Sequence, residues 1–274
     1  MSKPLKTVIE PVSGFQWPNF KEIWSYRELF WVLLSRDIRV RYKQTVLGAL
    51  WALLKPFMMM VVFSLVFGKF AKVPSDGFPY PIFLYSALLP WTLFSGTLSQ
   101  SSTAILGSGY VLKKIYFPRM IIPIAAAGSP VVDYLVANAL MVAMAIYFGI
   151  APTWQIVFLP MMVFCLSLAG QGVGMALGSL AVSYRDFRHI IPFVVQIWMF
   201  VTPVIYGSSL LPEAWQFLLF LNPVTGLVEG CRHIWLGQPL DLLGVSVSAF
   251  LCVMIFVLGF VVFQQQESKM ADRI

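Results

Sequence analysis

Six apolar stretches, each close to the length of a membrane-spanning helix, constrain this chain more than any other feature of its sequence. A helix needs about 20 apolar residues to cross the hydrocarbon core of a bilayer. With 59% hydrophobic and only 11% charged residues among 274, the chain is too apolar for a water-soluble domain. Because lipid offers no water to unpaired backbone groups, these stretches are expected to be helical. The sequence therefore predicts an all-α membrane protein with six transmembrane helices. The expected spans, within a transmembrane domain at 44–263, are 47–68, 80–104, 121–149, 155–181, 192–206 and 242–263.

The apolar stretch at 210–236 follows the short fifth span and is interrupted by helix-breaking residues. Pro212, Asn222-Pro223, Gly226 and Gly230 divide it. We expect two half-length helices that dip into the outer leaflet and return, which is permissible where protein or a wet cavity covers the backbone. A seventh and an eighth span are the alternative.

Lysine and arginine residues are distributed very unevenly between the two expected sides of the membrane. Fifteen lie in the N-terminal segment, in the loops at 105–120 and 183–191, and in the tail at 264–274, whereas the opposite side carries Lys69, Lys72 and Arg232. Positively charged loops stay in the cytoplasm. The sequence therefore predicts a multi-pass protein of the cytoplasmic membrane with both termini cytoplasmic. The net charge of +7 reflects this topology and not a nucleic-acid-binding face.

A basic amphipathic helix is expected at 21–43, after a cytoplasmic tail at 1–20. Ile23, Phe30, Trp31, Leu34, Ile38 and Tyr42 fall on one side of it, and Arg36, Arg39 and Lys43 on the other. Arg41 lies on the apolar side, with Asp37 one turn earlier as the expected ion-pair partner. Such a helix can lie on anionic membrane lipids, dock a soluble partner, or do both.

Two cytoplasmic loops combine aromatic residues with charges. The loop at 108–119 contains Lys113, Lys114, Phe117 and Arg119, and the loop at 183–191 contains Tyr184, Arg185 and Asp186. We expect short helices that dock a soluble partner. Aromatic residues anchored at the membrane interface are the alternative interpretation.

Sequence motifs for catalysis, nucleotide binding and metal binding are absent from the chain. It has no GxxxxGK[ST] phosphate-binding loop, no HExxH and no GxSxG, and the spans place His189 and His233 on opposite faces. Cys165, Cys231 and Cys252 form no CxxC pair, so ordinary apolar packing is expected. The chain is therefore expected to be no enzyme and to bind no cofactor or metal, and any ATP must be bound by another chain.

The order of short motifs along the chain resembles the membrane subunits of ABC transporters that export lipid-linked polysaccharides such as O-antigen, capsule and teichoic acid. The similarity covers about residues 21–263. The matching positions are Arg39, Arg41-Tyr42, Thr45, Leu47-Gly48, Trp51, Pro56, Phe67-Gly68, Phe117-Pro118-Arg119, Tyr184-Arg185-Asp186, Gln196, Thr202-Pro203-Val204, Tyr206 and Asn222-Pro223.

This resemblance implies a bacterial homodimer bound to two cytoplasmic subunits that carry ATP and magnesium. It makes 21–43 the interface helix, 108–119 and 183–191 the coupling helices, and 210–236 the outer gate helices. The residues implied in coupling to the ATPase are Arg36, Arg39, Arg41, Lys113, Lys114, Phe117, Arg119, Tyr184, Arg185 and Asp186. An exporter of lipids or small amphiphiles is the alternative function. An enzyme or a carrier working alone would need more polar groups within the spans than Asp133 supplies.

Flat aromatic side chains suit the passage of a long hydrated glycan, because they offer contact without fixed hydrogen bonds. Candidate channel residues are Phe57, Phe63, Tyr85, Trp91, Phe94, Trp198 and Phe200, and the resemblance favours those on the first and fifth spans. Packing in the core or against lipid is the alternative for each.

Three further features lie within the spans. Lys55 either reaches back to the cytoplasmic head groups or meets the pyrophosphate of a lipid-linked substrate. Asp133 is expected to be a buried structural partner and not a proton carrier. The glycines at 170, 174 and 178 have GxxxG spacing, and we expect them to pack helices within one protomer, with dimerisation as the alternative.

Overall fold

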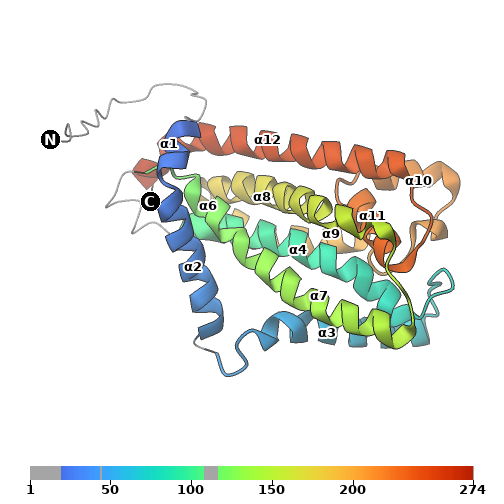
Figure 1. Cartoon of the computed structure of the whole chain (residues 1–274). Helices are drawn as coiled ribbons and strands as arrows, with labels where there is room; N and C mark the ends of the chain where they lie inside the picture. Colours follow the sequence, from blue (N-terminus) through green and yellow to red (C-terminus); the bar gives the residue numbers. More distant parts are fainter. Residues whose placement is uncertain (1–19, 44, 108–116, 274) are drawn as a thin grey trace.

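The computed structural model describes residues 20–43, 45–107 and 117–273, and within those ranges the chain is helical with no strand. Five helical segments are long and apolar enough to cross a membrane, which confirms the expectation of an all-helical membrane protein. They run side by side along the length of the molecule (Figure 1). The segments are Leu50–Phe70, Tyr80–Gly107, Ile121–Phe148, Trp154–Ser183 and Leu242–Glu267.

Helix α4 (Tyr80–Gly107) occupies the centre of this bundle. Of the 18 residues in its most apolar stretch, 78% are buried. The corresponding share for the first span is 11%. That first span consists of α3 (Leu50–Phe63) and a π-helical turn, η1 (Ser64–Phe70). The first span is therefore peripheral, and most of its apolar surface is left uncovered by the protomer.

Small residues let α8 (Leu159–Ser183) pack closely on α4 and on α12 (Leu242–Arg273). A Cβ atom at Gly174 would lie 2.6 Å from the carbonyl oxygen of Leu98 on α4. On the opposite face of α8, a Cβ atom at Gly259 of α12 would lie 2.0 Å from the carbonyl oxygen of Gly172. The glycine run thus packs helices within the protomer, as predicted.

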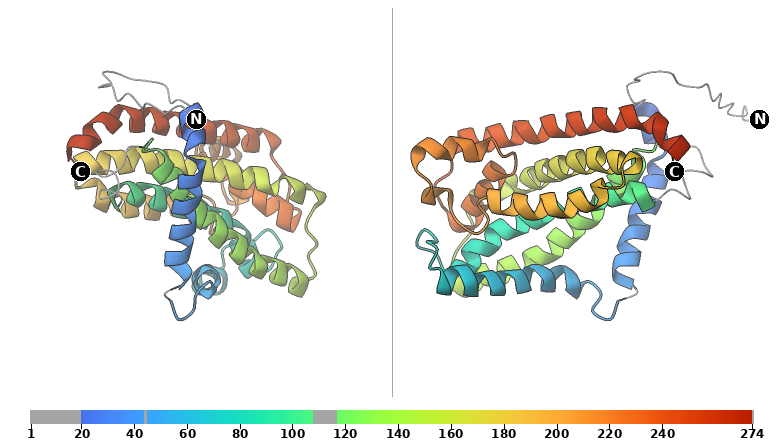
Figure 2. Two further views of the ribbon diagram at one scale, coloured as in Figure 1. Left: turned by 60° about the vertical axis from the view of Figure 1, so that its left-hand side comes forward. Right: turned by 180° about the vertical axis from the view of Figure 1, so that it is seen from behind.

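At one end of the bundle the N-terminal helices cross the long helices. Helix α1 (Phe20–Ser25) leads into α2 (Arg27–Lys43), which runs across α6 (Ile121–Ala126) and the start of α7 (Gly128–Phe148), as Figure 1 and Figure 2 show. A Cβ atom at Gly128 would lie 2.4 Å from Leu34 of α2, so the crossing is close. The last turns of α12 reach the same end (Figure 1). We call it the α2 end.

The opposite end, here the α11 end, is built from short helices. They are η2 (Trp154–Phe158), η3 (Ser208–Leu210), α10 (Glu213–Phe220) and α11 (Thr225–Leu236). Helices α10 and α11 are separated at Asn222-Pro223, as the sequence predicted, and both are too short to span a membrane. A seventh and an eighth span are therefore not formed.

The fifth expected span differs from the prediction at both ends. Helix α9 runs from Phe187 to Val201, so it begins before the expected start at 192 and stops before 206. Its 15 residues correspond to about 22 Å, less than the about 30 Å of hydrocarbon that a bilayer presents. The separate helix expected at 183–191 is wrong: Tyr184 to Asp186 form a turn that leads directly into α9.

Candidate functional site

The outward surface of α2 carries an exposed basic group of residues. Arg36 and Arg39 are exposed, and the Arg36 guanidinium donates to Asp37 at 2.8 and 2.9 Å. Arg39 donates to the carbonyl oxygen of Ser35, one turn earlier, at 3.2 Å. On the inward side Leu33 is buried against α6 in a cluster with Ile121. The helix therefore packs by its apolar side and leaves these two arginines available to a partner.

Arg41 does not pair with Asp37, which corrects the expectation from the sequence. Its guanidinium instead forms an ion pair with Asp133 of α7, and the Tyr42 hydroxyl donates to the other oxygen of the same carboxylate. Asp37 is occupied by the adjacent Arg36. Burial, together with the Asp133 carboxylate, raises the pKa of Tyr42, so this phenol stays protonated and continues to donate. Asp133 is thus a structural partner, as predicted, and is half-buried.

The residues predicted in the first coupling helix lie partly outside the described residues. Lys113 and Lys114 fall in the segment 108–116, which the structure does not describe. Phe117 is 4% exposed and packs in the cluster beneath α2. Arg119 donates to the backbone carbonyl of Glu267 near the end of α12, and its own N–H donates to the Glu267 carboxylate at 3.4 Å. Phe117 and Arg119 therefore contact neighbouring helices of the same chain.

The turn between α8 and α9 is exposed at the same end of the molecule. Tyr184 is 60% exposed, and Arg185 and Asp186 are exposed as well. Just before the turn, Val182 packs in a cluster that also includes Ile23 of α1 and Phe263 of α12. The fold thus brings the exposed arginines of α2 and this turn to one end, although they are far apart in the sequence.

The aromatic residues predicted to line a channel divide into buried and accessible groups. Tyr85 and Phe94 are fully buried and Trp91 is 3% exposed; the Tyr85 hydroxyl donates to the carbonyl oxygen of Ala137 at 3.0 Å. These three residues belong to the core of the protomer and present no surface to a substrate. Phe57, Phe63 and Trp198 are half-buried, and Phe200 is 54% exposed. These accessible rings are on α3 and α9, which correspond to the first and fifth spans expected from the sequence.

Lys55 is exposed on α3, on the same helix as Phe57. None of the three ion pairs found among the described residues includes it. An unpaired ammonium group within an apolar span is free to interact with an anionic head group or ligand.

Thr202-Pro203-Val204 and Asn222-Pro223, two of the motifs named in the sequence analysis, meet near the α11 end. Trp198 of α9 donates to the Asn222 side-chain oxygen at 2.9 Å, and the Asn222 amide donates to the Thr202 hydroxyl at 2.9 Å. The N–H of Val224 donates to the same Asn222 oxygen at 3.2 Å. These bonds fix the end of α9 to the start of α11, so Trp198 has a structural role as well as an accessible ring.

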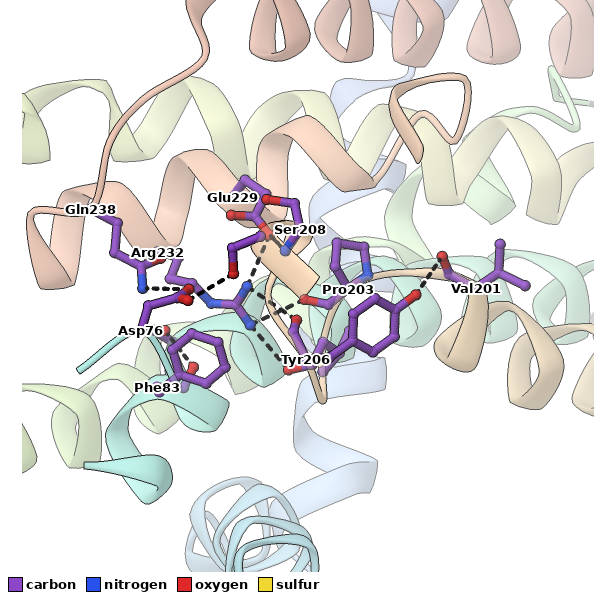
Figure 3. A network of polar contacts seen from close by, with 12 residues as sticks. Asp76, Phe83, Val201, Pro203, Tyr206, Ser208, Glu229, Arg232 and Gln238 are labelled. Carbon is purple, nitrogen blue, oxygen red and sulfur yellow. Dashed lines mark hydrogen bonds and ion pairs between the residues drawn. The ribbon is translucent and has the colours of Figure 1, made fainter. Parts of the chain in front are cut away.

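Arg232 forms a buried polar network that sequence reasoning missed, because it counted this residue only as a charge on the outer side. Its side chain is fully buried, 4.0 Å above the Phe83 ring, and donates to Glu229 at 2.9 Å (Figure 3). Further donations reach the carbonyl oxygens of Pro203 and Val204 at 3.1 Å and of Tyr206 at 3.4 Å. The sequence signal was the i,i+3 spacing of Glu229 and Arg232, which places both on one helix face.

Asp76 extends this network to the connection between η1 and α4. Its carboxylate accepts from the Ser209 hydroxyl at 2.7 Å and from the Gln238 amide at 3.3 Å (Figure 3). The network therefore joins three segments at the α11 end: the connection before α4, the connection after α9, and the end of α11. A buried guanidinium with several acceptors holds such segments in one arrangement.

None of these sites has the composition of a catalytic or metal centre. Among the described residues there is no group of three or more His, Cys, Asp or Glu side chains that could hold a metal ion. Most of the polar contacts described above join helices to one another. The exposed charged residues among the predicted sites that the structure describes are Arg36, Arg39, Lys55, Arg185 and Asp186.

Comparison with known proteins gives a family match over most of the chain. The family model described as "ABC-2 type transporter" matches residues 28–236. The O-antigen export system permease protein RfbA of Myxococcus xanthus is 27% identical over 257 residues, which cover 93% of this chain and 98% of that protein. RfbA of Klebsiella pneumoniae is 23% identical, with 89% and 94% covered. The polysialic acid transport protein KpsM of Escherichia coli is 22% identical, with 87% and 93% covered.

Proposed function

Because the chain belongs to the ABC-2 type transporter family, we propose that it is the transmembrane subunit of an ATP-driven exporter of lipid-linked polysaccharide, such as O-antigen or a related cell-surface glycan. The observation that carries this proposal is similarity along almost the whole length of permeases named for O-antigen export and polysialic acid transport. The fold adds an all-helical bundle in which the predicted channel rings of α3 and α9 are accessible.

The proposed assembly is a homodimer in the bacterial cytoplasmic membrane with two ATP-binding subunits. In this arrangement the α2 end is cytoplasmic and receives the ATPase. Arg36 and Arg39 on α2 and the turn of Tyr184, Arg185 and Asp186 form the docking surface, together with Lys113 and Lys114. Phe117, Arg119 and Arg41 act from behind that surface by holding α2 and the first loop in place. ATP and magnesium are bound by the partner subunit.

The proposed topology has six crossings, with α9 as a short fifth one. The chain passes along the bundle in α3, α4, α6 with α7, α8, α9 and α12, and the first and last described helices meet at the α2 end (Figure 1). An even number of crossings places both termini on the same side of the membrane, and the distribution of lysine and arginine makes that side the cytoplasm. Helices α10 and α11 then serve as gate helices at the outer face.

The proposed channel lies between two protomers, against the uncovered faces of α3 and α9. Phe57, Phe63, Trp198 and Phe200 offer flat ring surfaces there, along which a hydrated polymer can slide. Lys55 is proposed to meet the pyrophosphate of the lipid-linked substrate as it enters. Tyr85 is no longer part of this set, because the core covers it.

Deletion of the gene for this chain tests the function directly. We expect the cell surface to lose its polysaccharide while the lipid-linked glycan accumulates inside, and a plasmid copy to restore export. Unchanged surface glycan in the deletion strain would contradict the proposal. If glycan export persists while a phospholipid or a small amphiphile is no longer exported, the alternative function is the correct one.

A further inference from the structure

A pocket of about 590 Å³ opens at the α11 end between η2, α8, α11 and α12. Its wall is mainly apolar and includes Phe158, Met162, Leu227 and Ala249, and its volume is in the range of pockets that hold small ligands. Trp154 and Leu242 at its edge are 73% and 70% exposed. The pocket is therefore open to the surroundings of the bundle.

The pocket lies on the side of the molecule away from the proposed channel. Helix α12, which forms one wall, and α3, which carries the proposed channel surface, are on opposite sides of the bundle (Figure 1). Two of its walls come from helical segments that are apolar enough to span a membrane. In a bilayer the medium at the mouth of this pocket is therefore lipid, and a lipid chain is the ligand available at the highest concentration.

Two residues in the pocket wall have hydrogen-bonding atoms without a partner. The Gln155 side-chain oxygen and His233 Nε2 are both buried, and no described residue donates to either atom. His233 Nδ1 lies against the carbonyl oxygen of Gln238, so in the neutral ring the hydrogen is on Nδ1 and Nε2 is an acceptor. The apolar interior of the pocket is thus bordered by two residues whose acceptor atoms are unfilled and covered by the protein.

We propose that this pocket binds a bilayer phospholipid whose head group carries hydrogen-bond donors, such as phosphatidylethanolamine. One acyl chain occupies the apolar interior. The ammonium group donates to the Gln155 oxygen and to His233 Nε2, once these two side chains shift so that both atoms face the pocket. An unfilled buried acceptor is unfavourable, and a donor from the ligand removes that cost.

The depth of the two acceptors agrees with a head-group contact. Gln155 is in η2, at the start of the fourth span, and head groups lie at the ends of spans. The wall is also held in place: the N–H of Thr153 donates to the carbonyl oxygen of Ile234 at 2.8 Å, which joins the start of η2 to α11. A fixed wall of this kind reduces the ordering cost of binding.

A comparison of two phospholipids with the same acyl chains tests the head-group contact. Phosphatidylcholine shares the acyl chains, the phosphate and the net charge of phosphatidylethanolamine, but its larger, trimethylated nitrogen has no hydrogen to donate. The delipidated full-length chain in detergent is titrated with each lipid, and bound lipid is counted by native mass spectrometry. We expect about three- to tenfold tighter binding of phosphatidylethanolamine, as one or two net hydrogen bonds provide. Equal binding would overturn the proposal and indicate that water fills the two acceptors.

Three variants localise the binding. Gln155→Leu is expected to remove most of the preference for phosphatidylethanolamine, and Ala249→Phe, which fills the pocket, to weaken binding of both lipids. Ala139→Phe, at an exposed position on α7, is the matched control and is expected to change neither. If Ala249→Phe leaves lipid binding unchanged, the lipid binds elsewhere and the proposal is wrong.

A measurement on the wild-type protein tests the proposal without relying on whether the variants fold. Phosphatidylethanolamine with a photoreactive group on its acyl chain is bound to the wild-type protein, irradiated, and mapped by peptide mass spectrometry. We expect labelling concentrated on Trp154–Met162 and on 240–249. Labelling that is no stronger there than at the exposed Leu135 and Ile146 of α7 would contradict the proposal.

Discussion

At the scale of single residues, Asp133 shows how tertiary contacts decide a partner that sequence spacing suggested wrongly. Asp37 and Arg41 have the i,i+4 spacing of a helical ion pair, which favours pairing but does not require it. The fold instead brings α7 beneath the end of α2, where Asp133 accepts from both Arg41 and Tyr42. The residues in this contact are about a third of the chain apart, so no local sequence pattern indicates it.

Removing the Asp133 carboxylate is expected to destabilise the protein. Asp133→Ala leaves Arg41 and Tyr42 without their acceptor, and charge-assisted bonds of this kind contribute about 1.5–3 kcal/mol. The ion pair of Asp37 with the adjacent, exposed Arg36 joins neighbours within α2 and is worth about 1 kcal/mol or less, so Asp37→Ala is the matched control. We expect thermal unfolding in detergent to shift to a clearly lower temperature only for Asp133→Ala. Equal shifts for both variants would show that the Asp133 contact stabilises the protein no more than the Asp37 pair does.

Lys55 is the residue whose proposed role can be tested most directly. Lys55→Gln retains the length of the side chain but removes the charge, so we expect slower glycan export and weaker stimulation of ATP hydrolysis by the substrate. Lys69→Gln changes an exposed lysine in η1, near the other end of the same span, and is expected to behave as wild type. Both rates are measured on the complex with its ATPase in proteoliposomes. Wild-type rates for Lys55→Gln would exclude the pyrophosphate contact.

At the scale of helices, the sequence located breaks and close packing better than helix ends. The division of 210–236 at Asn222-Pro223 and the packing of the glycine run both follow from local steric properties, and both are confirmed. The expected boundary at Pro192 is wrong because this proline lies inside α9, which begins at Phe187. The sequence could not predict the burial of Tyr85 either, since an aromatic ring in an apolar helix can face the core, lipid or a channel.

The contact between α8 and α12 gives a prediction at this scale. Gly259→Ala places a methyl group where only 2.0 Å separates the Cβ position from the carbonyl oxygen of Gly172, so the two helices must move apart. Gly107→Ala at the end of α4 meets no atom within 4 Å and is the control. We expect Gly259→Ala to lower the unfolding temperature and the yield of folded protein, because close packing stabilises helices in lipid. If it unfolds like Gly107→Ala, α8 and α12 are not packed this closely.

At the scale of the whole molecule, apolar length predicted the long helices, whereas the orientation inferred from charge stays a prediction. The positions of the long spans follow from the apolar runs, because lipid leaves the backbone no alternative to helices. The distribution of basic residues predicts which end of the bundle is cytoplasmic. What the sequence did not reveal is the buried network around Arg232, which depends on contributions from three separate segments and therefore appears only in the folded chain.

The orientation of the molecule in the membrane is the last prediction. If the α2 end is cytoplasmic, a cysteine at the exposed Arg185 is shielded from reagents outside the cell, whereas one at the exposed Lys72 is accessible. The native Cys165, Cys231 and Cys252 are buried, so wild-type labelling gives the background. We expect a membrane-impermeant maleimide to label Lys72→Cys on intact spheroplasts and Arg185→Cys only after permeabilisation. The reverse pattern would invert the topology and move the proposed ATPase surface to the wrong side. The proposed topology has an odd number of crossings between residues 72 and 185, which puts them on opposite sides of the membrane. Labelling of both positions without permeabilisation would contradict this.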